Sequence, residues 1–215
     1  MIDGRIDLDA AVAMMAEAVD TARARDGVGH VVVPGGRSPT RLYAALAAAG
    51  LPDATWRLHL SDERCVPADD PRRNAPSVAA ALRLAPGHPA RPSGPPALDD
   101  DAEAARRHAA RLADVPDFAI VVLGLGADGH VASLLPGDPR PLAPDAPDAL
   151  VVVSAAHDPP RRITLSAARL ARTPTLLLVV DGDDKDAAVA AVEVGADVPA
   201  NRVVGPRRLL VDLRG

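Results

Sequence analysis

Four short segments rich in glycine or charged residues each follow an apolar run of the kind that forms a buried strand. They span residues 35–38, 61–64, 128–130 and 181–185. In open parallel sheets, ligands bind beyond the carboxyl ends of the strands. A scaffold alone does not need polar or glycine-rich turns at four such ends, so we expect these segments to converge on one binding site.

The first segment has the composition of an anion-binding turn. Gly35 and Gly36 allow the backbone to approach a ligand closely, and the helix expected after them favours an anion at its N-terminus. Arg37 and Ser38 add hydrogen-bond donors, so a phosphate is the natural ligand. The pattern is neither a P-loop nor a dinucleotide fingerprint, and an ordinary strand-to-helix turn is the alternative interpretation.

The segment at residues 128–130 places a histidine where it can work as a general base. Gly126 and Gly129 leave room above the strand end, and a histidine there can accept a proton near neutral pH. Asp128 can orient His130 or hold a substrate hydroxyl. The alternative is a capping aspartate beside a surface histidine.

The two remaining segments supply charge. Asp62 and Glu63 can bind sugar hydroxyls and Arg64 can bind an anion, although an internal ion-pair cluster is the alternative for at least one of the three. Lys185 is the only lysine of the chain, all other strong bases being arginine. In a chain that otherwise uses arginine, a single lysine suggests a position where a point charge is needed that arginine cannot supply. One lysine could also remain by chance.

Composition excludes several classes of protein. The 215 residues carry a formal net charge of −5 and only 1 % aromatic residues, which argues against nucleic-acid binding by a basic surface or by base stacking. No run of about 18 apolar residues predicts a transmembrane helix, and the N-terminus lacks a signal-peptide pattern. We therefore expect a cytoplasmic protein without a nucleic-acid or membrane partner. The oligomeric state is left open.

Other catalytic sites lack their sequence patterns. The histidines and the single cysteine are scattered, whereas zinc ligands would cluster, and no G-x-S-x-G nucleophile elbow is present. Cys65 cannot form an internal disulfide and has no adjacent base, so we interpret it as a small packed residue. Ser133, three residues after His130, is expected to cap or pack.

Apolar runs alternate with helical patterns along the chain. We predict strands at residues 30–33, 57–60, 118–123, 150–153, 162–165, 176–180 and 209–213, and helices at residues 8–25, 77–84, 99–113 and 184–194. A further helix is expected after Ser38, which would cap it, and before Gly50. Residues 85–97, rich in proline and glycine, are expected to be a surface connection. The alternation predicts one α/β domain over residues 1–215, doubly wound and Rossmann-like, with a mainly parallel sheet and helices on both faces.

Taken together, the segments also resemble a known family. Residues 33–39 (VPGGRSP), 61–67 (SDERCVP) with Asn74, 123–134 (LGLGADGHVASL) and 162–164 (RIT) occur in this order. In these motifs the chain is similar to the 6-phosphogluconolactonase family and, more broadly, to the glucosamine-6-phosphate isomerase and deaminase superfamily. The resemblance covers nearly the whole chain, and the three long motifs are specific in combination.

The resemblance implies hydrolysis of 6-phospho-D-glucono-1,5-lactone, the second step of the oxidative pentose phosphate pathway, without a metal or an organic cofactor. It implies that His130 activates water beside Asp128, and that the glycine turn, Arg37, Arg162 and Lys185 form the phosphate end. With the residues singled out above, the expected substrate-binding set is Gly35, Gly36, Arg37, Ser38, Asp62, Glu63, Arg64, Asn74, Gly126, Gly129, Arg162 and Lys185.

Two alternatives share the resemblance. Deaminases of the superfamily also have the glycine turn and Asp-Gly-His, but they carry a glutamate five residues after that histidine, where this chain has Leu135, which cannot transfer a proton. Sugar-phosphate sensor domains carry a helix-turn-helix segment ahead of the fold, and a first strand near His30 leaves too little chain for one. A sensor without activity would also be expected to lose His130, so we expect a lactonase.

Overall fold

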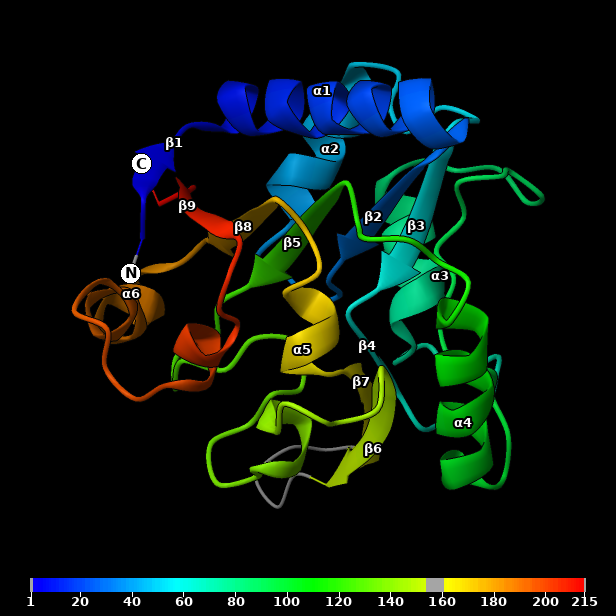
Figure 1. The fold of residues 1–215 in the computed structure, drawn as a ribbon. Coiled ribbons are helices and arrows are strands. Elements are labelled where there is room, and N and C mark those ends of the chain that lie inside the picture. Colours follow the sequence, from blue (N-terminus) through cyan, green and yellow to red (C-terminus); the bar gives the residue numbers. More distant parts are fainter. Residues whose placement is uncertain (1, 154–160, 215) are drawn as a thin grey trace.

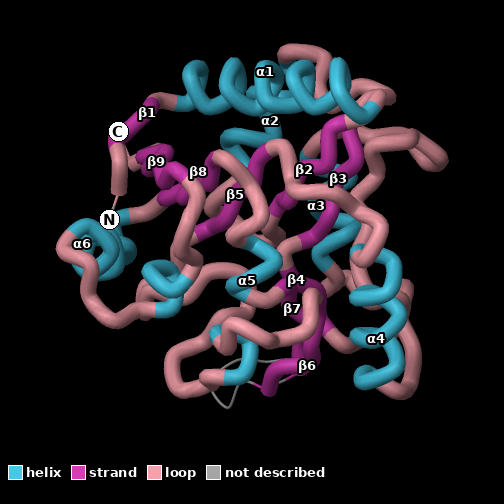
Figure 2. Tube along the Cα trace, in the orientation of Figure 1, coloured by secondary structure: helices cyan, strands magenta, loops and turns pink. Residues whose placement is uncertain are grey.

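A six-stranded parallel sheet lies at the centre of the computed structural model, which describes residues 2–153 and 161–214 (Figures 1 and 2). Every neighbouring pair of strands in it runs parallel. In spatial order the strands are β1 (Gly4–Ile6), β9 (Arg207–Asp212), β8 (Thr175–Val180), β5 (Ile120–Gly124), β2 (Gly29–Val33) and β3 (Trp56–Leu60). This order brings the carboxyl ends of β8, β5 and β2 next to one another.

Both faces of this sheet are buried, which explains the uninterrupted apolar runs of its strands. Side chains alternate between the two faces along a strand. In β5, Ile120 and Val122 belong to the apolar core on one face, while Val121 and Leu123 belong to the core on the other. All four side chains are fully buried.

Helices cover both faces (Figure 1). On the face of Ile120 lie α1 (Leu8–Asp26), α2 (Thr40–Ala48) and α3 (Asn74–Ala81). On the face of Val121 lie α4 (Asp101–Leu112), α5 (Ala167–Leu170) and α6 (Asp186–Glu193). The predicted doubly wound α/β fold with a mainly parallel sheet is confirmed.

A second, antiparallel sheet, which the sequence analysis did not separate from the first, stands beside the carboxyl ends of the parallel strands. Its strands, in spatial order, are β4 (Asp62–Arg64), β7 (Arg161–Leu165) and β6 (Ala149–Val153). The chain passes from β3 into β4 through Ser61 alone. β4 consists of three charged residues and therefore has no apolar pattern to predict it. Its pairing with β7 sets Asp62 opposite Thr164 and Arg64 opposite Arg162.

Capping residues in the sequence mark the start of two helices correctly and of a third wrongly. The Asp7 carboxylate accepts a hydrogen bond from the backbone N–H of Ala10 at 2.8 Å and caps α1, which ends at Gly27 with a φ of +80°. Asp100 caps α4 in the same way. The predicted cap at Ser38 is wrong, because α2 begins at Thr40 and no side chain caps it.

Short elements are the ones that the sequence patterns missed. These are β1, β4 and α5, each of three or four residues, and the 3₁₀ turns η1 (Arg140–Leu142), η2 (Asp183–Lys185) and η3 (Pro199–Arg202). The turn η2 takes the place of the first predicted turn of α6. In the part of the chain that the structure describes, no helix has both the length and the apolar character needed to cross a membrane.

Candidate active site

A cavity of about 440 Å³ opens at the carboxyl ends of β2, β5 and β8, beside β4 and β7. All four segments singled out in the sequence contribute to it. Of the predicted site residues, only Glu63, Asp128 and Gly129 are not in its wall. The lining residues are Pro34, Gly35, Gly36, Arg37, Ser38, Asp62, Arg64, Asn74, Gly124, Leu125, Gly126, His130, Ala132, Arg162, Asp181, Gly182, Asp184 and Lys185.

The turn between β2 and α2 requires its two glycines for different reasons. Gly36 has a φ of +85°, a conformation that other residues rarely adopt. A Cβ atom on Gly35 would lie 2.0 Å from Oδ1 of Asn74, so the turn packs directly on that side chain. The backbone of the turn therefore forms one wall of the cavity, with the start of α3 behind it.

His130 and Asp128 form a hydrogen-bonded pair in the loop after β5. The ring Nδ1 of His130 lies 2.5 Å from Oδ1 of Asp128, which also accepts a hydrogen bond from the backbone N–H of His130 at 3.1 Å. Because Nδ1 faces a carboxylate, the neutral ring holds its proton there, and Nε2 is the nitrogen that can accept one. The ring lies on Gly126, where a Cβ atom would come within 2.1 Å of Nδ1.

The carboxyl of Asp128 is ionised more readily than usual. Burial opposes ionisation, but hydrogen bonds and charge from His130 outweigh it, so the pKa of Asp128 lies below its ordinary value. Asp128 lies behind the imidazole, outside the cavity wall. Gly129 lies there too, with a φ of +81° and its Cα against the side chain of Val198. Asp128 and Gly129 thus support the His130 loop and do not contact the cavity.

Two arginines face the cavity from neighbouring strands of the small sheet. Arg64 and Arg162 are register partners of β4 and β7, and Nη1 of Arg162 lies 3.7 Å from Oδ2 of Asp62. Burial lowers the pKa of Arg162, the charge of Arg64 acts in the same direction, and Asp62 opposes both. Within the described residues, Nε of each arginine is buried without a hydrogen-bond partner. Two adjacent arginines, of which only Arg162 is close to the Asp62 carboxylate, favour an anionic ligand.

Asp62 is held from the loop that carries the histidine. The hydroxyl of Ser133 donates a hydrogen bond to Oδ2 of Asp62 at 2.7 Å, and the hydroxyl of Ser61 donates to Oδ1 at 3.1 Å. Asp62 and both serines are buried. Ser133 packs as expected, and its contact ties the His130 loop to the small sheet.

The fourth segment brings more than its lysine to the cavity. Nζ of Lys185 forms an ion pair with Asp184 at 2.8 Å, and this contact is the main cause of the lowered pKa of Asp184. Asp181, Gly182 and Asp184 also line the wall, although the sequence analysis named only Lys185. Their position directly after β8 was the available signal, since the segment as a whole was expected at the site.

Glu63, like Gly129, is a predicted ligand-binding residue that the structure places outside the cavity wall. Its side chain is fully buried, and both carboxylate oxygens accept backbone N–H groups at the start of α3. Nε of Arg73 lies 3.6 Å from its Oε2. The alternative of an internal ion-pair cluster therefore holds for this residue, and no sugar hydroxyl can reach it.

The chain matches one family model along almost its whole length. Residues 7–211 match the model of the glucosamine-6-phosphate isomerases/6-phosphogluconolactonase family. The chain belongs to this family. Its relatives include a 6-phosphogluconolactonase of Caulobacter vibrioides, 35 % identical over 83 % of this chain and 80 % of the relative. Another is a 6-phosphogluconolactonase of Mycobacterium tuberculosis, 32 % identical over 97 % of this chain and 91 % of the relative.

Solved structures of the family share the fold. A 6-phosphogluconolactonase of Shewanella baltica superposes with a TM-score of 0.84 at 23 % identity, over 99 % of this chain and 98 % of that one. A monomeric glucosamine-6-phosphate deaminase superposes with a TM-score of 0.77 at 19 % identity, over 99 % and 97 % of the two chains. Because lactonases and a deaminase both share this architecture, the side chains of the cavity must decide between the two activities.

Proposed function

We propose that this chain hydrolyses 6-phospho-D-glucono-1,5-lactone to 6-phospho-D-gluconate, with His130 as the general base. The observation that carries the proposal is the pairing of His130 with Asp128 at the wall of a cavity that also holds Arg37, Arg162 and Lys185. A base of this kind suits the activation of water, and the cations suit a substrate that carries a phosphate. The named lactonases among the relatives support the same substrate.

The phosphate of the substrate binds at the glycine turn. The backbone of Gly35 and Gly36 and the side chain of Ser38 surround it, while Arg162 and Lys185 neutralise its charge. Nζ of Lys185 also lies 2.8 Å from the carboxylate of Asp184, so phosphate and Asp184 compete for the same ammonium group.

With the phosphate anchored, the lactone carbonyl faces the histidine. His130 takes a proton from a water molecule at Nε2, and the resulting hydroxide attacks C1 of the lactone. Asp128 holds the opposite ring nitrogen and stabilises the imidazolium that forms. The tetrahedral intermediate collapses by breaking the bond from C1 to the ring oxygen, and His130 returns its proton to that oxygen.

Negative charge develops on the carbonyl oxygen during attack and needs a donor. Arg37 and Arg64 line the cavity and can supply one. The backbone N–H groups of Gly126 and Gly129, near which a donor was also expected, already donate to the carbonyls of His130 and Gly126. Loss of a single donor of this kind costs roughly 10²–10³ in rate. Because the lactone also opens without a catalyst, the acceleration required of this site is modest.

The deaminase activity of the same family is disfavoured by one position. Leu135 stands where deaminases carry a glutamate that moves protons during ring opening. Its side chain is buried, apolar and outside the cavity wall. No proton can be transferred from it, so the cavity supports water activation by His130 alone.

The test is turnover of freshly prepared lactone at low temperature and mildly acidic pH, where the spontaneous reaction is slow. Formation of 6-phosphogluconate is followed through a coupled dehydrogenase, with and without EDTA. We expect acceleration far above the uncatalysed rate, unaffected by EDTA, and no turnover of glucosamine 6-phosphate. Folded protein that leaves the lactone rate unchanged, or that deaminates glucosamine 6-phosphate, would overturn the proposal.

A further inference from the structure

Glu63 lies next to the cavity without touching it, and it forms the cap of α3. Its Oε1 accepts the backbone N–H of Asn74 at 2.6 Å, and its Oε2 accepts that of Ala75 at 3.0 Å. Oε1 also accepts the backbone N–H of Arg64 at 2.8 Å. The residue that precedes α3, Arg73, offers no side-chain cap of its own. A carboxylate from strand β4 therefore satisfies the free N–H groups at the start of this helix.

Asn74, the first residue of α3, connects the capped helix start with the cavity wall. Its Oδ1 accepts a hydrogen bond from Nη1 of Arg64, and its Nδ2 donates to the backbone carbonyl of Asp62 at 2.8 Å. The same side chain packs on the backbone of Gly35. Nη1 of Arg64 also donates to the backbone carbonyl of Arg72 at 3.0 Å, so Asn74 and the residues just before α3 together fix the guanidinium of Arg64 in the cavity wall.

The charge of Glu63 is balanced behind the site by Arg73. Nη2 of Arg73 donates to the carbonyl of Pro95 at 2.9 Å, and Nη1 donates to that of Val66 at 3.2 Å. The side chains of both Glu63 and Arg73 are buried. A buried ion pair adds little net stability compared with an apolar pair of similar volume, so stability alone does not account for it. What it provides is a defined position for three backbone N–H groups.

We propose that Glu63 is a positioning residue for substrate binding, acting through Asn74 on Arg64. It holds the start of α3 so that Asn74 orients the Arg64 guanidinium toward the anionic substrate. The proposal rests on the proposed function, in which that substrate occupies the cavity.

A double-mutant cycle separates positioning from mere support of the fold. Glu63→Gln keeps the size of the side chain but turns an amide NH₂ toward N–H donors. We expect kcat/KM to fall about tenfold, the loss of roughly one hydrogen bond to a charged group. In an Arg64→Met background the same substitution is expected to change kcat/KM less than twofold, because its effect runs through Arg64. If the loss of kcat/KM in the double variant equals the product of the losses in Glu63→Gln and Arg64→Met, the proposal would be overturned.

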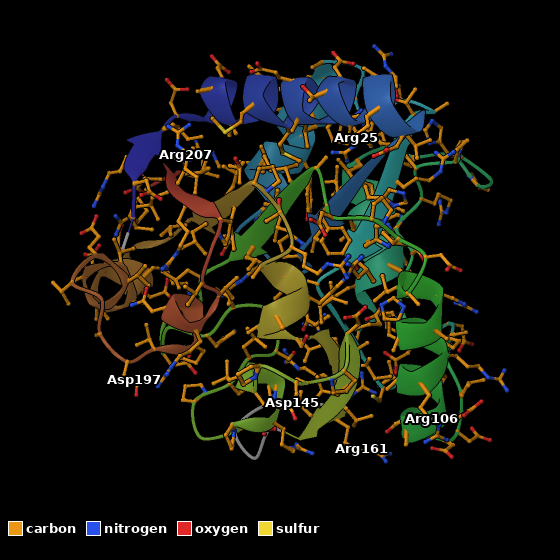
Figure 3. The ribbon with its side chains drawn as sticks, in the orientation of Figure 1. Arg25, Arg106, Asp145, Arg161, Asp197 and Arg207 are labelled. Atoms are coloured by element: carbon orange, nitrogen blue, oxygen red, sulfur yellow. The ribbon has the colours of Figure 1, made fainter. Side chains whose placement is uncertain are left out.

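Asp101→Asn is the matched control for a weakened buried carboxylate. Asp101 is buried at the start of α4 and forms an ion pair at 2.9 Å with Arg161. Figure 3 labels Arg161 near the lower edge of the molecule. It does not line the cavity. We expect this variant to lose thermal stability and keep kcat/KM within twofold of the wild type. An equal loss of kcat/KM in Asp101→Asn would show that destabilisation alone explains Glu63→Gln.

A second readout does not depend on turnover. The Nε–H resonance of Arg64 in ¹H–¹⁵N spectra, assigned by its absence in Arg64→Met, should move in Glu63→Gln and stay in place in Asp101→Asn. Should Glu63→Gln fail to fold, Glu63→Asp serves instead, since its shorter carboxylate keeps the charge but falls short of the helix. An unmoved resonance would overturn the positioning role. If the wild type does not turn over the lactone but Glu63→Gln still shifts the Arg64 resonance, only the proposed function would be overturned.

Discussion

His59 on β3 is a buried histidine whose replacement should change the response of the protein to acid. Its ring Nε2 lies 2.9 Å from Nδ1 of His30, and its ring packs at 5.6 Å from that of Phe118. Burial, together with the charges of His30, His108 and Arg169, lowers the pKa of His59 from 6.5 to about 3. His108 on α4 is also buried, and its pKa is lowered to about 4.

The sign and size of the effect follow from these pKa values. Above pH 6.5 both the folded and the unfolded chain hold His59 neutral, so it adds no pH dependence. Below pH 6.5 the unfolded chain takes up a proton that the folded chain accepts only near pH 3. The free energy of unfolding therefore falls by about 1.4 kcal/mol per pH unit, or about 2 kcal/mol at pH 5. His108 adds a similar amount at that pH.

Denaturant unfolding at pH 7.5, 6 and 5 measures this directly, with the fluorescence of Trp56, the only tryptophan, as the probe. In His59→Leu we expect the fall in unfolding free energy between pH 7.5 and pH 5 to be smaller than in the wild type by about 2 kcal/mol. His108→Leu should give a similar reduction, and the double variant their sum. The absolute stability of the variants does not enter the comparison. A His59→Leu protein that loses stability with acid as steeply as the wild type would refute the reasoning.

Three further substitutions test the cavity itself. Asp128→Asn removes the carboxylate that holds Nδ1 of His130 at 2.5 Å, so kcat should fall by roughly 10²–10⁴ with little change in KM; a KM effect alone would count against it. Gly126→Ala places a Cβ atom 2.1 Å from the His130 ring, so kcat should drop at least as far while the far-UV spectrum is kept; unchanged kcat would contradict the placement of the ring. Lys185→Met removes a charge at the phosphate end, so KM should rise about ten- to hundredfold with kcat nearly constant; equal KM in wild type and variant would exclude the lysine from phosphate binding.

The parallel sheet was predictable because its strands are buried on both faces. The apolar runs at 30–33, 118–123 and 176–180 needed no long-range information, and their carboxyl ends had to meet if the sheet was parallel. That is why Gly35, His130 and Lys185 could be expected in one cavity from the sequence alone. In the small sheet β6 and β7 were predicted as strands, but β4 was not, because it is charged along its whole length and pairs with a strand about a hundred residues later. Without β4, nothing in the sequence separated this sheet from the parallel one.

The role of Glu63 was beyond the sequence for a related reason. A carboxylate in a charged tripeptide looks exposed, and burying it is costly unless donors compensate. Apart from the backbone N–H of Arg64, the donors here are backbone N–H groups of α3 and the guanidinium of Arg73, ten or more residues away along the chain. Only the three-dimensional arrangement shows that this acid faces the helix, whereas its neighbours Asp62 and Arg64 face the cavity.

The most direct test of the account compares His130→Ala with the wild type in two measurements on the same preparation: kcat on the lactone, and the dissociation constant of the product 6-phosphogluconate. We expect kcat to fall by roughly 10²–10⁴, since the base is lost. We also expect a product affinity within about threefold of the wild type, since the cationic side chains remain. Turnover close to that of the wild type, or a loss of product affinity as large as the loss of turnover, would contradict the role of His130 as the base.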